Sequence, residues 1–355
     1  MVANTLRTLI FILFPLVTFG QSIDLSVTQQ TANNSPSTFL LEKGMITIAG
    51  GNLEFAGSGT RISNYQSLGI SADRSMVSLL KRSSGKSQIM LFSSNGDTLT
   101  THTGSTIGSG DPSLGIFSFD NGDILLRDNI TNFTFFDTFG EVYNSTSISS
   151  QTEDGEQISE VVLSDNNQTL ILYSPKIQRG DKLGSRAVAM SSSGDFNRIF
   201  SDTDRYLKNV TVSSNGDMIV AITAREGTED RVVIMDRYGN TLNTISTDEN
   251  LKGAALSTDM GYITLYSGGR IMVYEALTGE RLGATSSSSS VFLADYFPED
   301  NLLLALTGNY SERRGIMNGV EFRAINLEQR EITSEEFSGP LGFTQKITPH
   351  FVLNR

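Results

Sequence analysis

Short runs of apolar, mostly β-branched residues alternate with turn residues along most of the chain. Residues 209–223 show the unit clearly, because two such runs flank Ser214-Asn215-Gly216-Asp217. An Asn-Gly pair in this position favours a tight hairpin with a type I′ turn, in which Asn and Gly both adopt positive φ. Few stretches carry the i, i+3, i+4 apolar pattern of a helix. The chain is therefore predicted to be all-β.

This hairpin recurs at a regular period. Its copies begin at Ile70, Ile116, Val161, Val210, Ala254 and Phe292, which are spaced by 46, 45, 49, 44 and 38 residues. A repeat of about 40–50 residues is typical of a four-stranded propeller blade. The pattern predicts that each copy supplies the two inner strands of one blade.

A second hairpin lies in every gap between these copies. The second hairpins cover residues 88–97, 133–141, 187–195, 232–240, 271–280 and 322–330. Each has an apolar run followed by polar turn residues, as expected for the outer strands of a blade. Six complete blades follow, at approximately 66–112, 113–157, 158–205, 206–249, 250–289 and 290–337.

Each end of the chain has half a blade left over. Residues 341–355 repeat the frame of residues 68–82, whereas residues 38–65 contain strand-like runs without an inner hairpin. Pairing 338–355 with 38–65 would complete a seventh blade and protect exposed strand edges. We therefore predict one propeller domain over residues 38–355. The alternatives are six blades with an appended sheet, or eight blades if Ile23 to Val27 also contributes.

The Ser-x-Asp/Asn-Gly-x-apolar signature at the inner turns resembles the broad superfamily of YVTN-type, TolB-like and WD-repeat propellers. The resemblance covers almost the whole chain after the leader, and it implies a fold rather than a chemistry. The chain has no Trp, so it lacks the Trp-Asp pairs of the WD-repeat family. Residues 257–264 are similar to the Asp-box of sialidase-type propellers. That family has its boxes at outer turns, whereas this single copy lies at an inner turn, so an ordinary turn capped by Asp259 is the better explanation.

Residues 1–20 have the layout of a signal peptide. Arg7 precedes an apolar run from Leu9 to Val17, and Thr18-Phe19-Gly20 provides a cleavage site before Gln21. The run is too short to span a bilayer, and no later stretch reaches 18 apolar residues. The sequence thus predicts an exported protein, periplasmic or secreted, with an N-terminal extension at 21–37 and no transmembrane segment.

Charge and cysteine content restrict the partners. The full chain has a formal net charge of −12, which becomes −13 without the leader because residues 1–20 contain one base and no acid. This charge disfavours nucleic acid, whose binding depends on neutralising phosphates. The absence of Cys excludes disulfides and thiolate metal sites. We expect a monomer whose partner is a protein or an acidic glycan.

No linear motif for catalysis, a cofactor or a metal is recognisable. The two histidines, His102 and His350, are too few and too isolated for a nucleophilic triad or a zinc site. The acidic clusters lack the spacing of a calcium loop. We therefore predict a binding module without a cofactor. The alternative is a lactonase- or hydrolase-like enzyme with a metal or polar site at the central channel, for which scattered residues leave no motif.

The best candidate for a partner site is a group of bases in the longer loops that join inner to outer hairpins. These loops contain eleven Lys and Arg against five acids. The bases are Lys81, Arg82, Lys86, Lys176, Arg179, Lys182, Arg186, Arg225, Arg231, Arg313 and Arg314. Arginine on surface loops suits carboxylate or phosphate groups. Alternatively, these bases pair with acids of the blade-to-blade connections, which are Glu153, Asp154, Glu156, Asp202 and Asp204.

Overall fold

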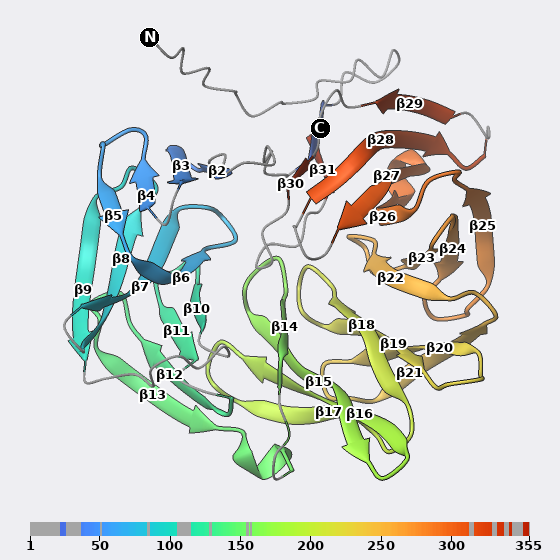
Figure 1. Cartoon of the computed structure of the whole chain (residues 1–355), viewed down its shortest axis with the longest axis horizontal. Coiled ribbons are helices and arrows are strands. Elements are labelled where there is room, and N and C mark those ends of the chain that lie inside the picture. The colour runs from blue at the N-terminus through green and yellow to red at the C-terminus, as the bar shows by residue number, and fades with distance from the viewer. Residues whose placement is uncertain are drawn as a thin grey trace.

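The computed structural model confirms an all-β fold with seven four-stranded blades. It describes residues 22–25, 37–49, 52–83, 86–104, 115–127, 130–153, 156, 158–311, 316–328, 332–336, 341–342 and 351–354. Seven antiparallel sheets contain four consecutive strands each, and a separate sheet contains two. The seven sheets form a ring that runs from β2–β5, in blue, to β26–β29, in red (Figure 1). The molecule is therefore a β-propeller.

The strands follow one another in chain order within every blade. Blades 1 to 3 consist of β2 (Ser37–Leu41), β3 (Gly44–Ala49), β4 (Asn52–Phe55), β5 (Arg61–Ser63), β6 (Tyr65–Ile70), β7 (Met76–Ser83), β8 (Lys86–Ser93), β9 (Thr98–Gly104), β10 (Gly115–Ser118), β11 (Ile124–Arg127), β12 (Asn132–Phe136) and β13 (Val142–Ser147). Blades 4 and 5 consist of β14 (Glu160–Leu163), β15 (Thr169–Arg179), β16 (Lys182–Ser191), β17 (Phe196–Asp202), β18 (Tyr206–Val212), β19 (Met218–Ala224), β20 (Asp230–Asp236) and β21 (Thr241–Thr247). Blades 6 and 7 consist of β22 (Leu251–Leu256), β23 (Tyr262–Ser267), β24 (Arg270–Glu275), β25 (Arg281–Ser286), β26 (Val291–Phe297), β27 (Leu302–Ser311), β28 (Ile316–Asn326) and β29 (Ile332–Glu336). Two single turns of 3₁₀-helix are present: η1 (Ser149–Gln151) lies between blades 3 and 4, and η2 (Pro298–Asp300) lies in the hairpin turn between β26 and β27.

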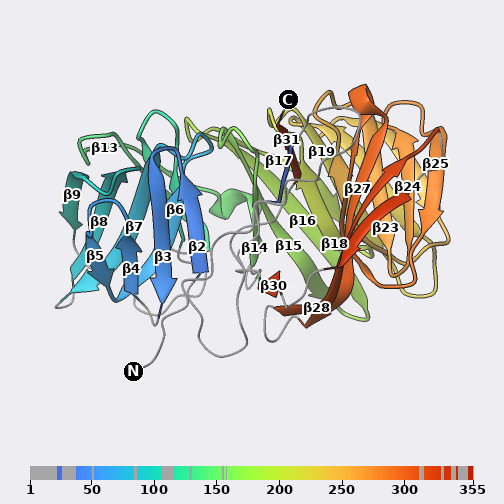
Figure 2. The same cartoon turned by 90° about the horizontal axis from the view of Figure 1, so that it is seen from above.

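This strand order gives the ring two different faces. Figure 2 shows the strands running between the faces, and in Figure 1 the first strand of each blade lies towards the centre. We call the face with the turns inside each hairpin the turn face. The opposite face carries the loops between the second and third strands, together with the blade-to-blade connections, and we call it the connection face. The described residues of the loops in which the sequence suggested partner-binding bases lie on the connection face.

The predicted type I′ turn at residues 214–217 is wrong in its backbone geometry. Only Gly216 has positive φ, at 82°, and its N–H donates to the Ser213 carbonyl. Asn215 instead uses its side chain, which accepts hydrogen bonds from Ser213 Oγ (2.8 Å) and the Asp217 N–H (3.1 Å). A side chain that replaces a backbone acceptor makes positive φ at Asn unnecessary. The hairpin itself forms as predicted.

Hydrophobic clusters join neighbouring blades. Six clusters each combine buried residues of two adjacent blades, from blades 1 and 2 to blades 6 and 7. The seventh cluster contains Leu304, Leu306 and Met317, all at 0% exposure, together with other residues of blade 7 alone. Among the described residues, blade 1 contributes nothing to it. Among the side chains that the structure describes, packing between blades therefore differs at the junction of the first and last blades.

The strand pairing predicted to close the ring is not confirmed. Blade 1 takes all four of its strands from residues 37–63, because a second hairpin forms where the Gly59 N–H and the Thr60 carbonyl bond to Phe55. Its last strand, Arg61–Ser63, is short and polar, and the apolar pattern did not reveal it. At the C-terminus, β30 (Leu341–Gly342) pairs with β28, and β31 (Phe351–Asn354) pairs with β1 (Ser22–Leu25). The two ends of the chain meet in this two-stranded sheet instead of sharing a blade.

Candidate interaction surfaces

Two of the predicted partner-binding bases belong to a buried ion-pair network on the connection face. Arg186, on β16, is 5% exposed and donates to Glu156 Oε2 and to Glu153 Oε1, both at 2.6 Å. Arg179 donates to the same oxygen of Glu153 at 2.6 Å. Glu156 also accepts hydrogen bonds from Ser174 Oγ (2.7 Å) and the Glu153 N–H (2.8 Å). These charges satisfy one another, so they stabilise the junction of blades 3 and 4.

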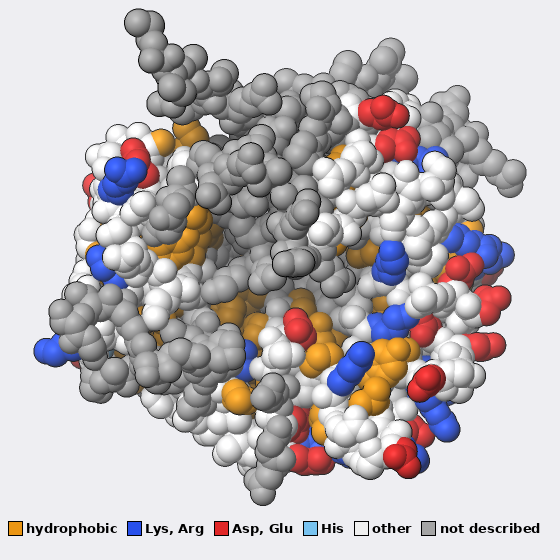
Figure 3. Space-filling model, viewed as in Figure 1, with side chains coloured by type: hydrophobic (Ala, Val, Ile, Leu, Met, Phe, Trp, Pro, Cys, Tyr) orange, Lys and Arg blue, Asp and Glu red, His pale blue; other side chains and the backbone are white. Residues whose placement is uncertain are grey.

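Further bases are also engaged within the chain. Arg225 Nη1 lies 3.1 Å from Asp204 Oδ2, and Lys182 Nζ lies 3.8 Å from the same oxygen. The Lys176 ammonium lies 4.8 Å from the centre of the Tyr206 ring. Figure 3 shows basic and acidic side chains interspersed over the blades on the right of the view. Pairing with acidic connections, the alternative suggested by the sequence, therefore accounts for Arg179, Lys182, Arg186 and Arg225.

The structure describes the side chains of some of the remaining bases but not of others. Lys81 is partly buried, whereas Lys86 and Arg231 are exposed. The side chain of Arg231 has no hydrogen-bond or ion-pair partner among the described residues. The side chain of Arg82, and Arg313 and Arg314 as a whole, lie outside the described residues, as does Asp154.

A pocket beside blade 5 gathers three arginines. It has a volume of about 700 Å³ and is lined by Arg205, Arg225, Gly227, Thr228, Glu229, Arg231, Ser246 and Asp248. The pocket lies between the β19–β20 loop and the end of β21, on the connection face. Of the eleven predicted bases, Arg225 and Arg231 are thus the two that line a common cavity.

Arg205 forms the fixed floor of this pocket. It is 7% exposed, and it donates to Thr223 Oγ1 (3.0 Å), the Thr223 carbonyl (3.0 Å) and the Glu229 carbonyl (2.8 Å). Burial, followed by the positive charge of Arg231, lowers the pKa of Arg205, and Asp202, Asp230 and Asp204 oppose this effect. Two guanidinium groups that disfavour each other's charge create a site where an anion would be stabilised.

Sequence reasoning missed Arg205 because it considered only the loops between inner and outer hairpins. Arg205 follows Asp202 and Asp204 in a blade-to-blade connection, which was treated as a source of acids. The sequence signal that could have identified Arg205 is its position: it is a base that follows two acids in a blade-to-blade connection, directly before a strand. Its convergence with Arg225 and Arg231 depends on how blades 4 and 5 pack.

Near the ring axis, Asp295 is an unusual carboxyl group. It lies on β26, the first strand of blade 7, and its Oδ1 is buried without a hydrogen-bond partner. Burial raises the pKa of Asp295 to about 8, against the opposing effect of the Tyr296 N–H, and Asp165 of blade 4 raises it further. Burial also raises the pKa of nearby Tyr266 to about 12, and the Asp295 charge adds to that effect. A polar group with a perturbed pKa at the middle of the ring is a candidate functional group.

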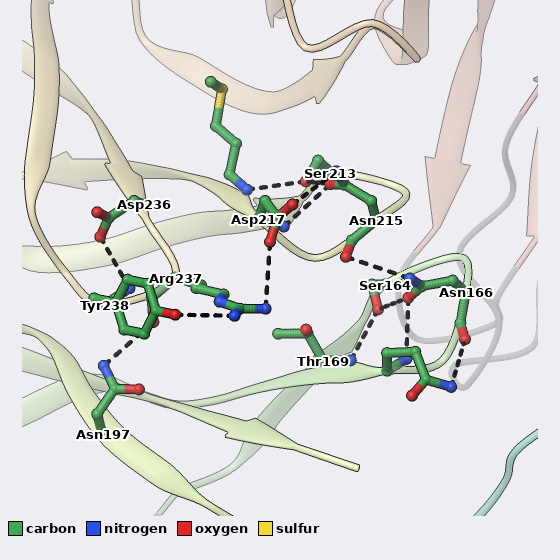
Figure 4. Close-up of polar contacts among 12 residues, drawn as sticks. Ser164, Asn166, Thr169, Asn197, Ser213, Asn215, Asp217, Asp236, Arg237 and Tyr238 are labelled. Carbon is green, nitrogen blue, oxygen red and sulfur yellow. Dashed lines mark hydrogen bonds and ion pairs between the residues drawn. The ribbon is translucent and has the colours of Figure 1, made fainter.

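The hairpin turns of several blades share one polar design. Four inner turns each contain a Ser whose Oγ donates to an Asp or Asn two residues later and accepts the N–H five residues later. The pairs are Ser71 with Asp73, Ser164 with Asn166, Ser213 with Asn215, and Ser257 with Asp259. Figure 4 shows two of these turns and the exposed Arg237, which lies between Asp217 and Tyr238. The resemblance of residues 257–264 to an Asp-box therefore reflects the same capping role for Asp259.

The two histidines do not lie in a common site that can be described. His102 lies on β9, and its ring centre is 5.1 Å from that of Phe136. His350 lies outside the described residues. In the part of the chain that the structure describes, no three His, Cys, Asp or Glu side chains come together as metal ligands. None of the described segments forms a helix long and apolar enough to cross a membrane.

Comparison with known proteins places the chain in a fold class. Neither a protein-family model nor a curated protein matches the sequence. Among solved structures, the chain is similar to a eukaryotic initiation factor (11% identity, TM-score 0.54, covering 90% of this chain and 96% of the other). It is similar to BamB from Moraxella catarrhalis (12%, 0.50, 89% and 92%) and to the Dos1 propeller (11%, 0.54, 89% and 85%). At such low identity these similarities establish the β-propeller fold alone.

Proposed function

We propose that this protein is an exported propeller that binds an acidic protein at the pocket formed by Arg205, Arg225 and Arg231. Export rests on the signal-peptide layout of residues 1–20, which lie outside the described residues. The site lies on loops held by a rigid scaffold, which is where binding usually resides. The observation that carries the proposal is that these three arginines line one pocket of about 700 Å³.

The three arginines contribute to binding in different ways. Arg205 is fixed by four hydrogen bonds to blade 5, so it contributes positive charge without losing side-chain freedom. Arg231 is exposed and offers its guanidinium group for a bidentate contact with a carboxylate. Arg225 pairs with Asp204, and its side chain is 53% exposed, so it can exchange that partner for a ligand carboxylate at little cost.

The pocket favours a protein over an acidic glycan. Glu229, Asp248, Thr228 and Ser246 also line it, so carboxylates and hydroxyls lie beside the guanidinium groups. A peptide matches such a mixed surface because it offers carboxylates together with backbone N–H donors. Glu229 and Asp248 would repel the carboxylates of either kind of polymer, but the backbone N–H groups of a peptide can donate hydrogen bonds to them.

The proposal can be tested with defined anionic polymers. Binding of polyglutamate and of polygalacturonate would be measured at 20 mM and 300 mM salt for the wild type and for Arg225→Ser/Arg231→Ser. Arg237→Ser is the matched control, since Arg237 is equally exposed but lies on the turn face. We expect the double variant to lose at least about tenfold in affinity for polyglutamate and the control to lose none. Equal affinity for all three proteins would refute the site, and a preference for polygalacturonate would reassign the partner to a glycan.

The alternative of an enzyme at the ring axis is supported by one observation, the buried Asp295 with its raised pKa. A carboxyl group that holds its proton near neutral pH can act as a general acid. Among the described residues, no second titratable side chain forms a hydrogen bond or an ion pair with Asp295. This candidate function would require a substrate whose turnover is abolished by Asp295→Asn but not by Arg225→Ser/Arg231→Ser.

A further inference from the structure

The outermost strands of four blades expose a large apolar residue at the same structural position. In blades 2, 3, 5 and 6 the register between the third and fourth strands shifts near the turn, so one extra residue bulges from the fourth strand. The bulged residues are Leu99, Tyr143, Leu242 and Leu282, with exposures of 50%, 48%, 43% and 52%. A bulge interrupts edge pairing and redirects a side chain. The four copies therefore present apolar groups outward at the edge of the turn face.

The turns that precede these strands add further apolar groups. Phe139, Tyr238 and Leu277 occupy the turns of blades 3, 5 and 6, and they are 80%, 63% and 61% exposed. We call these three residues and the four bulged residues the apolar rim. Single exposed apolar residues are ordinary, but a repeated set along one edge indicates an interaction site.

Hydrogen bonds between blades fix the geometry of the apolar rim. Thr100 Oγ1, next to the bulged Leu99, donates to the Phe139 carbonyl of the following blade at 3.0 Å. In the same way Asn243 Nδ2, next to Leu242, donates to the Ala276 carbonyl beside Leu277 at 3.1 Å. Leu99 and Leu242 are thus held close to the turn of the following blade. The result is two apolar pairs on a rigid frame, with little conformational entropy to lose on binding.

The charge around the apolar rim is strongly negative. The ten hairpin turns of blades 2–6, counted with the strand residue on each side, contain thirteen acids and three bases. The acids are Asp73, Asp97, Asp120, Asp123, Asp137, Glu141, Asp165, Asp195, Asp217, Asp236, Asp259, Glu275 and Glu280, and the bases are Arg74, Arg237 and Arg281. Most of the net charge of the protein is therefore concentrated on the turn face, opposite the arginine pocket.

We infer that the apolar rim docks a second protein partner through a segment that combines basic and apolar side chains. Apolar contacts at the rim would supply the buried area, and the surrounding carboxylates would attract the bases and set the orientation. The same carboxylates would repel an anionic membrane, which disfavours a lipid surface as the partner. The inference is independent of the proposed function, because it concerns the opposite face and a partner of opposite charge.

Labelled synthetic peptides provide the test. Fluorescence anisotropy would measure binding of (Lys-Leu)6, (Lys-Ser)6 and (Glu-Leu)6 to the wild type and to Phe139→Ser/Tyr238→Ser/Leu277→Ser. All three substituted side chains are highly exposed, so the variant should fold. Tyr310→Ser is the control, because Tyr310 is an exposed apolar residue on the connection face.

We expect the wild type to bind (Lys-Leu)6 at least about tenfold more tightly than either other peptide. The triple variant should lose that advantage, whereas Tyr310→Ser should keep it. Equal binding of (Lys-Leu)6 and (Lys-Ser)6 would show a purely electrostatic surface and would overturn the role of the apolar rim. Stronger binding to phosphatidylglycerol vesicles than to (Lys-Leu)6 would also overturn the inference, in favour of a membrane.

Discussion

Substitution of Asp295 by Asn should change how the stability of the protein depends on pH. The carboxyl group of Asp295 has its pKa raised from 3.8 to about 8, mainly because Oδ1 is buried without a partner. In the unfolded chain the group releases its proton near pH 4, whereas in the folded protein it retains the proton up to about pH 8. Between these values the folded state binds more protons than the unfolded state. The contribution of this group to the unfolding free energy is therefore fully present below about pH 4 and is lost as the pH rises towards 8.

The size of this loss follows from the shift and from the surroundings of Asp295. A shift of one pKa unit corresponds to about 1.4 kcal/mol, so a fully buried carboxyl with this shift would lose roughly 5 kcal/mol between pH 4 and pH 8. The residue as a whole keeps part of its surface exposed, and water relieves part of the penalty. We therefore expect about 1–3 kcal/mol. The amide introduced by Asp295→Asn cannot ionise, so the variant should lack this dependence.

Urea unfolding followed by circular dichroism from pH 4.5 to 8.5 would measure the effect. The difference in unfolding free energy between Asp295→Asn and the wild type should increase with pH, whatever its value at pH 4.5. Asp217→Asn is the control, because Asp217 is an exposed acid in a hairpin turn and its variant should follow the wild type. If the curves of Asp295→Asn and the wild type run parallel over this range, the carboxyl group is already ionised in the folded protein and the reasoning is refuted.

Two further changes test how the scaffold is held together. Glu156→Ala should lower the unfolding free energy by about 2–4 kcal/mol in urea melts, because the half-exposed Glu153 would then be the only described acid paired with buried Arg186. Arg237→Ala, at an exposed ion pair, should cost less than about 1 kcal/mol. Equal losses for the two variants would contradict the burial of the network. Arg74→Gly should raise the melting temperature and add about 1 kcal/mol of stability, because Arg74 has φ of 61° in its turn. A lower melting temperature would show that contacts of the Arg74 side chain stabilise the folded protein by more than the strained backbone destabilises it.

The fold was predictable from the sequence because its information is local. Many hairpins combine an apolar run with Ser and Asx at fixed spacing, often followed by Gly, and Ser213, Asn215 and Gly216 make the contacts that such a turn requires. The closing arrangement was not predictable in the same way. The strand Arg61–Ser63 has one buried apolar residue, and the pairing of β31 with β1 joins segments more than 300 residues apart.

The candidate sites were harder to predict because they depend on which blades meet. The sequence grouped Arg179, Arg186 and Arg225 and named Glu153, Glu156 and Asp204 as possible partners, but it could not decide between ion pairs within the chain and a partner site. Tertiary packing decides which charges pair across a blade junction, and this packing cannot be deduced from the order of residues along the chain. The bulges in the fourth strands could not be predicted from the sequence for a related reason. An extra residue in one strand is visible only against its partner strand.

Hydrogen exchange with and without polyglutamate tests the central claim, that an acidic partner binds at the arginine pocket of blade 5. Amide exchange would be mapped by mass spectrometry on the intact protein at low salt. We predict slower exchange on addition of polyglutamate in residues 225–231 and 246–248, which line the pocket, and no change in the hairpin turns of the opposite face. Protection confined to the far end of the long β15–β16 hairpin, residues 177–184, or to the turn face, with residues 225–231 unchanged, would contradict the claim.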